Sequence, residues 1–94
     1  MGGPNLEDGM SEQLVGVVDH WYGHLNVAGI RLTDGHLSVG DRIHIVGHTT
    51  DLTTTVGSMQ IDHETVDAAD TGDQVGVEVT DRVRVGDDVY LVSG

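Results

Sequence analysis

Two histidines beside an aromatic pair are the residues best suited to chemistry in this sequence. His20 and His24 lie on either side of Trp21 and Tyr22, and imidazoles near a carboxylate such as Asp19 suit zinc or nickel. A four-residue spacing aligns side chains on a helix, whereas the glycine between these histidines indicates a bend. We therefore predict no metal site and no cofactor, and keep His20 and His24 as weak metal-ligand candidates. The other histidines are scattered and are interpreted as polar surface residues: His36, His44, His48 and His63.

The aromatic pair is the first candidate for binding a partner. Trp21 and Tyr22 are adjacent, so a strand would point them to opposite faces, one in the core and one exposed. An exposed aromatic ring can anchor a protein partner or stack on a nucleobase, although covering one end of the fold is the simpler alternative. Arg31 and Arg42 are the basic candidates. The predicted partner-binding residues are thus Trp21, Tyr22, Arg31 and Arg42.

The sequence contains few residues or motifs that could support catalysis. The chain has no cysteine, which excludes disulfides and thiol nucleophiles, and no lysine, which excludes Schiff-base chemistry and a nucleotide-binding P-loop. No serine lies in a G-x-S-x-G motif. Residues 67–78 have the Asp, Gly and Glu spacing of a calcium-binding loop, but Ala69 and Thr71 occupy ligand positions. We therefore expect that the chain is not an enzyme.

The charge of the chain limits its partners and surroundings. Sixteen acidic residues oppose four basic ones, giving a formal net charge of −12. This charge would repel phosphate backbones and anionic membranes, so the expected partner is a protein or a ribonucleoprotein. Direct binding of nucleic acid is not expected to be electrostatic, and no membrane partner is expected. An acidic, lysine-free domain also suggests adaptation to concentrated salt. No apolar run approaches the roughly 20 residues that span a bilayer, so a cytoplasmic protein is expected.

Short β-rich runs dominate the chain after its first residues. Residues 1–13 contain the only proline and no periodic apolar pattern, which predicts a flexible leader. From residue 14, β-rich runs alternate with turn residues every 8–12 residues or so, the pattern of a small sandwich or barrel. A single all-β domain is predicted over residues 14–94. Its expected strands are 14–21, 26–32, 41–46, 52–61, 74–80 and 89–92.

One short pattern occurs twice. Residues 37–43 read LSVGDRI and residues 83–89 read VRVGDDV, so both have an apolar-x-Val-Gly-Asp-x-apolar pattern. Glycine can supply the left-handed residue of a turn, and the following aspartate can hydrogen-bond the turn backbone as the next strand begins. The pattern predicts the same turn chemistry at both places, with structural roles for Gly40, Asp41, Gly86 and Asp87.

Four motifs in order resemble domain 2 of elongation factor Tu, a β-barrel found in elongation and initiation factors. They are VGVV at 15–18, LSVGDRI at 37–43, VGSMQI at 56–61 and VDAADTGDQVGV at 66–77. In the last motif, Gly72 permits a turn and Gly76 lets another backbone approach or the barrel bend. The resemblance covers roughly residues 14–92. It implies a small closed antiparallel β-barrel of six to seven strands with no substantial helix.

The resemblance also bears on function. In that family the barrel follows a GTP-hydrolysing domain, whereas this chain has no P-loop, so it resembles a stand-alone copy of the module, of a kind also found in small archaeal proteins. We therefore predict a non-enzymatic binding or adaptor module, translation-associated through protein or ribonucleoprotein docking, in a salt-adapted organism. The alternative is a histidine-dependent metal-binding or small-ligand-binding protein.

Overall fold

The chain folds as an all-β domain. The structure is a computed structural model and describes residues 11–93, which form strands and no helix. The first strand begins at Ser11, so residues 11–13 belong to it, while the rest of the expected leader lies outside the described residues. The strands are β1 (Ser11–Tyr22), β2 (Val27–Leu32), β3 (His36–Ser38), β4 (Arg42–Val46), β5 (Asp51–Thr55), β6 (Met59–Ile61), β7 (Glu64–Val66), β8 (Ala68–Asp70), β9 (Gln74–Glu78) and β10 (Asp88–Ser93).

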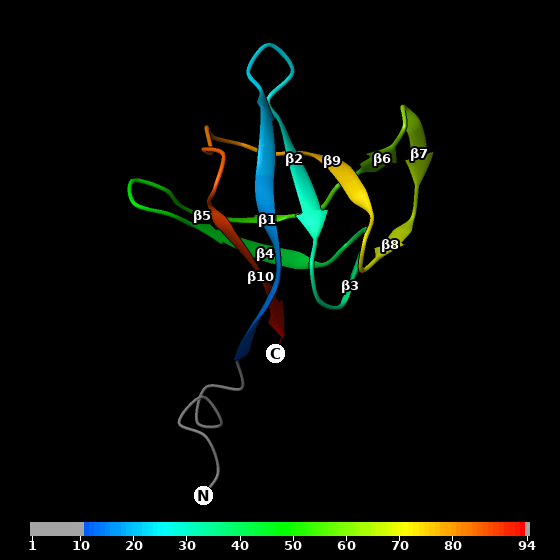
Figure 1. The fold of residues 1–94 in the computed structure, drawn as a ribbon, viewed down its shortest axis with the longest axis horizontal. Coiled ribbons are helices and arrows are strands. Elements are labelled where there is room, and N and C mark those ends of the chain that lie inside the picture. The colour runs from blue at the N-terminus through cyan, green and yellow to red at the C-terminus, as the bar shows by residue number, and fades with distance from the viewer. Residues whose placement is uncertain (1–10, 94) are drawn as a thin grey trace, which may run out of the picture.

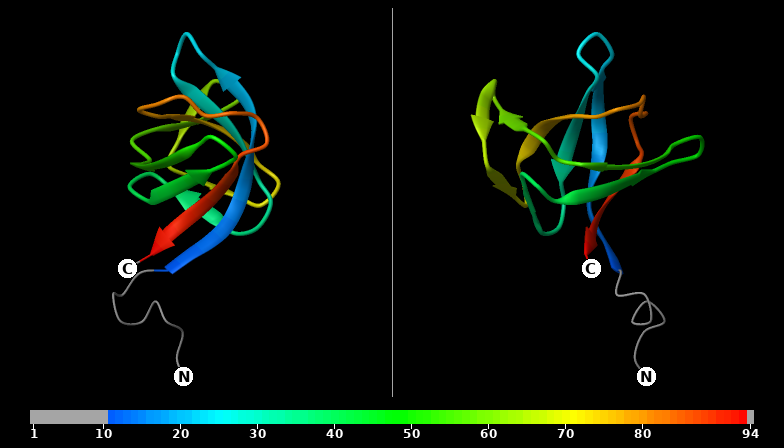
Figure 2. Two further views of the ribbon diagram at one scale, coloured as in Figure 1. Left: turned by 90° about the vertical axis from the view of Figure 1, so that its left-hand side faces the viewer. Right: turned by 180° about the vertical axis from the view of Figure 1, so that it is seen from behind.

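The strands form one large antiparallel sheet and one small one. The large sheet has eight strands in the order β5-β4-β10-β1-β2-β9-β6-β7, and β3 pairs with β8 in the second sheet. The large sheet bends strongly, so that β4 and β5 cross the direction of β1 and β2 on the other side of the interior (Figures 1 and 2). The long β1–β2 hairpin projects from the rest of the domain (Figure 1).

The predicted closed barrel is wrong, because the two edges of the large sheet do not pair. Its edge strands are β5 and β7. The β3–β8 pair lies where a closing ladder would be needed, and all four of the strands β3, β6, β7 and β8 are only three residues long. Isolated backbone bonds replace the ladder: Val39 N–H donates to Asp67 O at 2.9 Å and Gly40 N–H donates to Val56 O at 2.8 Å. Such short strands end before they can close the sheet.

The core is built from aliphatic side chains that alternate inward along the strands. In β9, for example, Val75 and Val77 are buried while Gln74 and Glu78 are exposed. Removing these aliphatic groups from water supplies the main stabilising free energy of so small a domain. The fully buried larger side chains are Ile30, Leu32, Leu37, Ile43, Ile45, Met59, Val15, Val18, Val56, Val75, Val77 and Val83. Within residues 11–93 no helix has the length and apolar character needed to cross a membrane.

The repeated Gly-Asp pattern forms the same turn at both places. Gly40 and Gly86 have φ angles of +97° and +99°, a conformation that favours glycine. Asp41 accepts a hydrogen bond from the N–H of Ser38 at 2.8 Å, and Asp87 accepts the equivalent bond from Arg84 at 2.8 Å. In each turn the carboxylate thus binds the backbone three residues earlier, as the next strand begins.

A third copy of this turn precedes β9. Gly72 has a φ of +96°, and Asp73 accepts a hydrogen bond from Asp70 N–H at 2.9 Å. Gly76 lies within β9 and not in a turn. A Cβ built at Gly76 would meet the Val27 side chain at 3.2 Å and no backbone atom among its nearest neighbours within 4 Å, so the close approach of another backbone does not explain this glycine. Its missing side chain leaves space on the outer face of the sheet.

Candidate functional site

A small hollow lies on the outer face of the sheet, over β2, β9 and β6. Gly29 of β2 pairs with Gly76 of β9. Their strand neighbours Ala28 and Val77 are buried in the core, so the two glycines face outward. Neighbouring side chains approach both positions: a Cβ would meet His20 Cβ at 3.0 Å above Gly29 and Val27 Cγ1 at 3.2 Å above Gly76. Both glycines line a hollow of about 210 Å³. This glycine pair is the floor of the candidate site.

The β1–β2 hairpin forms an apolar and aromatic wall of the hollow. Tyr22 and Leu25 line it and are 44% and 64% exposed. The Tyr22 ring packs on the His20 ring, with centroids 4.2 Å apart and planes tilted by 40°. The hairpin turn is fixed by a hydrogen bond from Leu25 N–H to Tyr22 O at 3.1 Å and by a positive φ at Asn26. One ring face of Tyr22 is therefore supported by a neighbour while its side chain stays accessible.

The opposite wall comes from the β6–β7 hairpin. Asp62 and His63 have φ angles of +52° and +67°, and the flanking residues Ile61 and Glu64 pair directly. Two consecutive residues with positive φ match the tight hairpin turn that suits the twist of antiparallel strands. This turn places Asp62 and His63 in the lining of the hollow, together with Gln60 of β6.

A shielded carboxylate lies beside the glycine floor. Asp19 is at a bulge of β1, where the register with β2 shifts. Its Oδ2 accepts a hydrogen bond from Gln74 Nε2 at 2.8 Å and lies 3.8 Å from Arg31 Nε. Its Oδ1 is buried, lies 3.2 Å from the position a Gly29 Cβ would take, and has no hydrogen-bond partner within residues 11–93. Because a buried, unpaired acceptor is costly, this oxygen has unused capacity to bind a donor.

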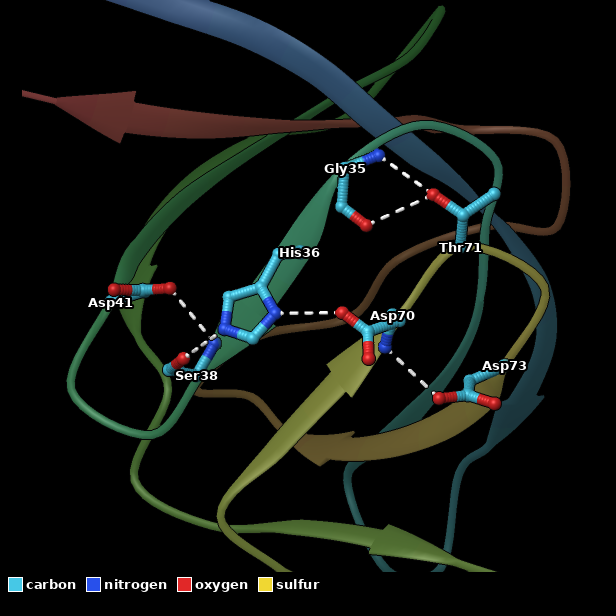
Figure 3. A network of polar contacts seen from close by, with 7 residues as sticks. All are labelled: Gly35, His36, Ser38, Asp41, Asp70, Thr71 and Asp73. Carbon is cyan, nitrogen blue, oxygen red and sulfur yellow. Dashed lines mark hydrogen bonds and ion pairs between the residues drawn. The ribbon is translucent and has the colours of Figure 1, made fainter.

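A second polar cluster joins β3 to β8 (Figure 3). His36 Nδ1 lies 2.9 Å from Asp70 Oδ1, and His36 Nε2 lies 2.8 Å from Ser38 Oγ. Next to it, Thr71 Oγ1 accepts from the N–H of Gly35 at 2.9 Å and donates to its carbonyl at 3.0 Å. Serine, histidine and aspartate in this order resemble the hydrogen-bonded chain of hydrolytic triads.

Backbone donors for acyl transfer are missing around this cluster. Such chemistry needs N–H groups aimed at a developing oxyanion near the serine. The N–H groups of Ser38, Val39 and Gly40 instead donate to a carboxylate and two backbone carbonyls, all at 2.8–2.9 Å. The described residues therefore support a structural role for the cluster, namely fastening the small β3–β8 sheet.

A third cluster places an imidazole between two carboxylates. His44 of β4 lies between Glu12 of β1 and Asp51 of β5: Nδ1 is 3.0 Å from Glu12 Oε2, and Nε2 is 2.5 Å from Asp51 Oδ1. The hydrogen bond to Asp51 and then that to Glu12 raise the pKa of His44 above its ordinary value of 6.5, against a smaller opposing effect of burial. The side chain is 22% exposed, so at pH values below its raised pKa His44 is a largely shielded cation that ties three strands together.

This bridge predicts a domain that loses stability as the pH rises. A raised pKa in the folded state means that the contribution is complete below the ordinary pKa of 6.5 and is lost as the pH rises through the folded value. We expect His44→Gln to lower the free energy of unfolding by about 0.5–1 kcal/mol at pH 6 and by much less at pH 9. Urea denaturation of both proteins at the two pH values measures this, with the exposed His48→Gln as the matched control. An equal loss at both pH values would contradict the charged bridge.

The predicted partner-binding residues do not form one cluster. Trp21 packs against the core and Tyr22 is exposed, which agrees with the opposite faces expected for the pair. Arg31 is on β2 and contacts Asp19, but neither residue lines the hollow. Arg42 is on β4, and the strands β10 and β1 lie between β4 and β2 in the sheet. Of the four residues, Tyr22 is the one that lines the hollow.

The histidine-dependent metal hypothesis gains no geometric support. His20 packs on Tyr22, and His24 lies in the exposed turn of the hairpin. In the part of the chain that the structure describes, no group of three or more His, Asp or Glu side chains is placed to hold a metal ion.

With the fold and its hollow described, the chain can be compared with known proteins. The family model of elongation factor Tu domain 2 matches residues 26–81, which is more than half of the chain. The chain belongs to the elongation factor Tu domain 2 family. The resemblance predicted from the sequence is therefore confirmed, and β2 through β9 of this domain-2 fold, including both floor glycines, lie within the matched region.

Other relatives of this domain-2 chain are proteases by name. An uncharacterized protease of Methanocaldococcus jannaschii is 43% identical over 79 residues, which cover 83% of this chain and 19% of that protein. The C-terminal domain of a Geobacillus thermoleovorans protein described as a U32 peptidase shares the fold, with a TM-score of 0.77 and 16% identity over 84% of this chain and 91% of that one. A selenomethionine variant of the same domain gives a TM-score of 0.73 at 15% identity, covering 87% and 99%.

These comparisons correct one expectation. The chain was expected not to be an enzyme, but the curated relative, 43% identical over 79 residues, is named a protease, so this comparison points to a protease-related protein. The solved structures, at 15–16% identity, show the shared fold. The chain spans about a fifth of the length of that curated relative.

Several residues of the candidate sites escaped the sequence analysis. The glycine floor needs Gly29 as well as Gly76, and a glycine between apolar residues of a strand is the signal that could have indicated it. Gln60 and Gln74 carry no distinctive pattern. His44 was interpreted as a surface residue, because its carboxylate partners are remote in the sequence or on another strand.

Proposed function

We propose that this chain serves as the β-domain of a protease-related protein, in which it binds and positions a polypeptide. The observation that carries the proposal is its 43% identity, over 79 residues, with a protein named as a protease. The match covers most of this chain but a fifth of the relative, as expected for one module of a larger molecule. The proposed binding surface is the outer face that carries the glycine floor, with Tyr22 as an exposed anchor.

The geometry of the hollow supports a binding role. Exposed aromatic and aliphatic side chains, Tyr22 and Leu25, lie beside amide and carboxylate groups of Gln60 and Asp62. Apolar anchors with a polar rim are the usual composition of protein-binding surfaces. The hollow lies on β1, β2, β6 and β9, which a bound partner would contact without entering the core.

A translation-associated module is the second candidate, favoured by the match to elongation factor Tu domain 2. The distribution of arginines gives it less support, since Arg31 is engaged with Asp19 and Arg42 lies elsewhere. Binding to ribosomes in molar KCl, measured by co-sedimentation, is the result that would favour this candidate over the first.

A domain exchange tests the proposed function. We expect the M. jannaschii protein, which is named as a protease, to bind an unfolded polypeptide, and we expect a chimera in which this chain replaces the matching 79-residue region to bind it equally well. The reason is that the two regions are 43% identical over 79 residues. Binding of a fluorescent unfolded casein to the parent, the chimera and a deletion variant measures the effect, with loss of at least about tenfold in affinity, or roughly 1.4 kcal/mol, expected only on deletion.

The matched control is a second chimera that carries domain 2 of a translational elongation factor. This domain belongs to the same family but lacks the closer identity to the protease. If both chimeras bind like the parent, the fold alone suffices and the specific relation to proteases is contradicted. If this chain behaves like the deletion variant, the proposed function is wrong.

A further inference from the structure

We propose that the hollow above Gly29 and Gly76 is a receptor for a single arginine side chain of a partner polypeptide. The hollow combines two glycines in its floor, an aromatic wall and a carboxylate acceptor, Asp62, on a strongly acidic domain. The inference deepens the proposed function by naming the chemistry that the domain recognises, and it rests on that function only for the polypeptide nature of the partner.

The size of the hollow favours one inserted side chain. Its volume is about 210 Å³, whereas pockets for drug-sized ligands and cofactors have volumes of about 300–1,000 Å³. The paired glycines line it where β2 and β9 are adjacent, and Tyr22 and Gln60 belong to the same lining. A long, unbranched side chain can lie over the glycines, while its main chain stays outside.

The aromatic wall suits a planar cation. The Tyr22 side chain is 44% exposed and lines the hollow, and its ring rests on His20 with a centroid distance of 4.2 Å. A guanidinium group stacks on such a ring through cation–π attraction. Arginine is favoured over lysine here because its planar group stacks and presents five donors in a fixed fork.

Acceptors for those donors surround the floor. Asp62 lines the hollow, and the Gln60 and Gln74 side chains offer amide oxygens. Asp19 Oδ1, buried beside Gly29, has no partner within residues 11–93. Asp19 itself is not among the residues that line the hollow, and its Oδ2 is already engaged by Arg31 Nε at 3.8 Å. The carboxylate that lines the hollow is therefore that of Asp62.

The overall charge agrees with a cationic ligand. With a formal net charge of −12, the domain attracts a basic segment over a distance set by ionic strength and repels an anionic one. A phosphate or nucleic-acid strand would have to approach Asp62 and Asp19 against this field. Charge complementarity therefore selects a basic polypeptide as the occupant.

Titration of the full chain with a short peptide tests the inference. The probe is Ac-Gly-Gly-Arg-Gly-Gly-NH₂, and its counterpart has citrulline, the neutral isostere of arginine. The titration is followed in ¹⁵N-correlated NMR spectra. We expect the arginine peptide to shift the amide signals of Gly29 and Gly76 and the side-chain signals of Gln60 and Gln74. The Kd of this peptide should be about 1 mM or lower. The citrulline peptide should bind at least about fivefold more weakly. The lysine peptide is expected between the two.

Variants locate the site and separate binding from folding. Tyr22→Ala and Asp62→Asn, both at exposed positions, should each weaken binding by at least about threefold, and Gly76→Leu should abolish it by filling the floor. Tyr90→Ala and Asp34→Asn, which change the same residue types outside the hollow lining, are the matched controls and should bind normally. No shift at 10 mM peptide in these titrations, equal binding of citrulline, or shifts centred away from the floor glycines would overturn the inference. Because the assay uses no protease, such a result leaves the domain-exchange test of the proposed function independent.

Discussion

Replacing Gly47 by alanine is expected to destabilise the domain by about 2–4 kcal/mol, a large part of the roughly 5–15 kcal/mol that holds a typical domain together. A Cβ at this position would overlap the carboxylate of Asp87, with its Cγ only 2.6 Å away. Asp87 is 5% exposed and accepts the hydrogen bond that fixes the turn before β10. Either this turn or the β4–β5 connection must move, and the melting temperature should fall by about 10–25 °C in calorimetry.

Gly57→Ala is the matched control for this substitution. A Cβ at Gly57 meets nothing within 4 Å, and its φ lies outside the range that requires glycine. The same chemical change should therefore alter the free energy of unfolding by less than about 0.5 kcal/mol. Equal effects of the two substitutions would show that the contact with Asp87 does not determine the loss.

Local chemistry explains which parts of the fold could be predicted. The Gly-Asp turns were predictable at Gly40 and Gly86, because a positive φ and a carboxylate that binds its own turn depend on residues within one short segment. The alternation of valines in β9 likewise indicates a strand from its own period. The all-β class follows from such local signals.

The features that the sequence did not predict depend on contacts between distant segments. Closure of the sheet depends on how far short strands such as β3 and β7 extend, which their own residues do not determine. The hollow exists because Gly29 and Gly76 become partners across β2 and β9, and that register is a property of the assembled sheet. The bridge at His44 similarly requires β10 to pair between β1 and β4, which brings Glu12 within reach.

Of the three aspartates that follow a turn glycine, the buried Asp87 should lose the most stability when it is replaced by alanine. Asp87, Asp41 and Asp73 each accept one backbone hydrogen bond in the same type of turn, at 2.8–2.9 Å. Only Asp87 among them is buried. Asp87→Ala leaves the Arg84 N–H without its acceptor in a shielded place, which should cost about 2–3 kcal/mol, against about 0.5–1.5 kcal/mol for Asp41→Ala or Asp73→Ala. Urea denaturation of the three variants gives the ranking.

The double variant Gly47→Ala/Asp87→Ala then identifies the cause of both losses. Removing the Asp87 carboxylate opens the space that the alanine at position 47 needs, so the second substitution should cost less than about 1 kcal/mol in this background. The two losses would then be clearly less than additive, by about 1–3 kcal/mol. Additive losses would mean that Gly47 and Asp87 act on stability independently, and that the close packing of the β4–β5 connection against the turn before β10 does not constrain the fold.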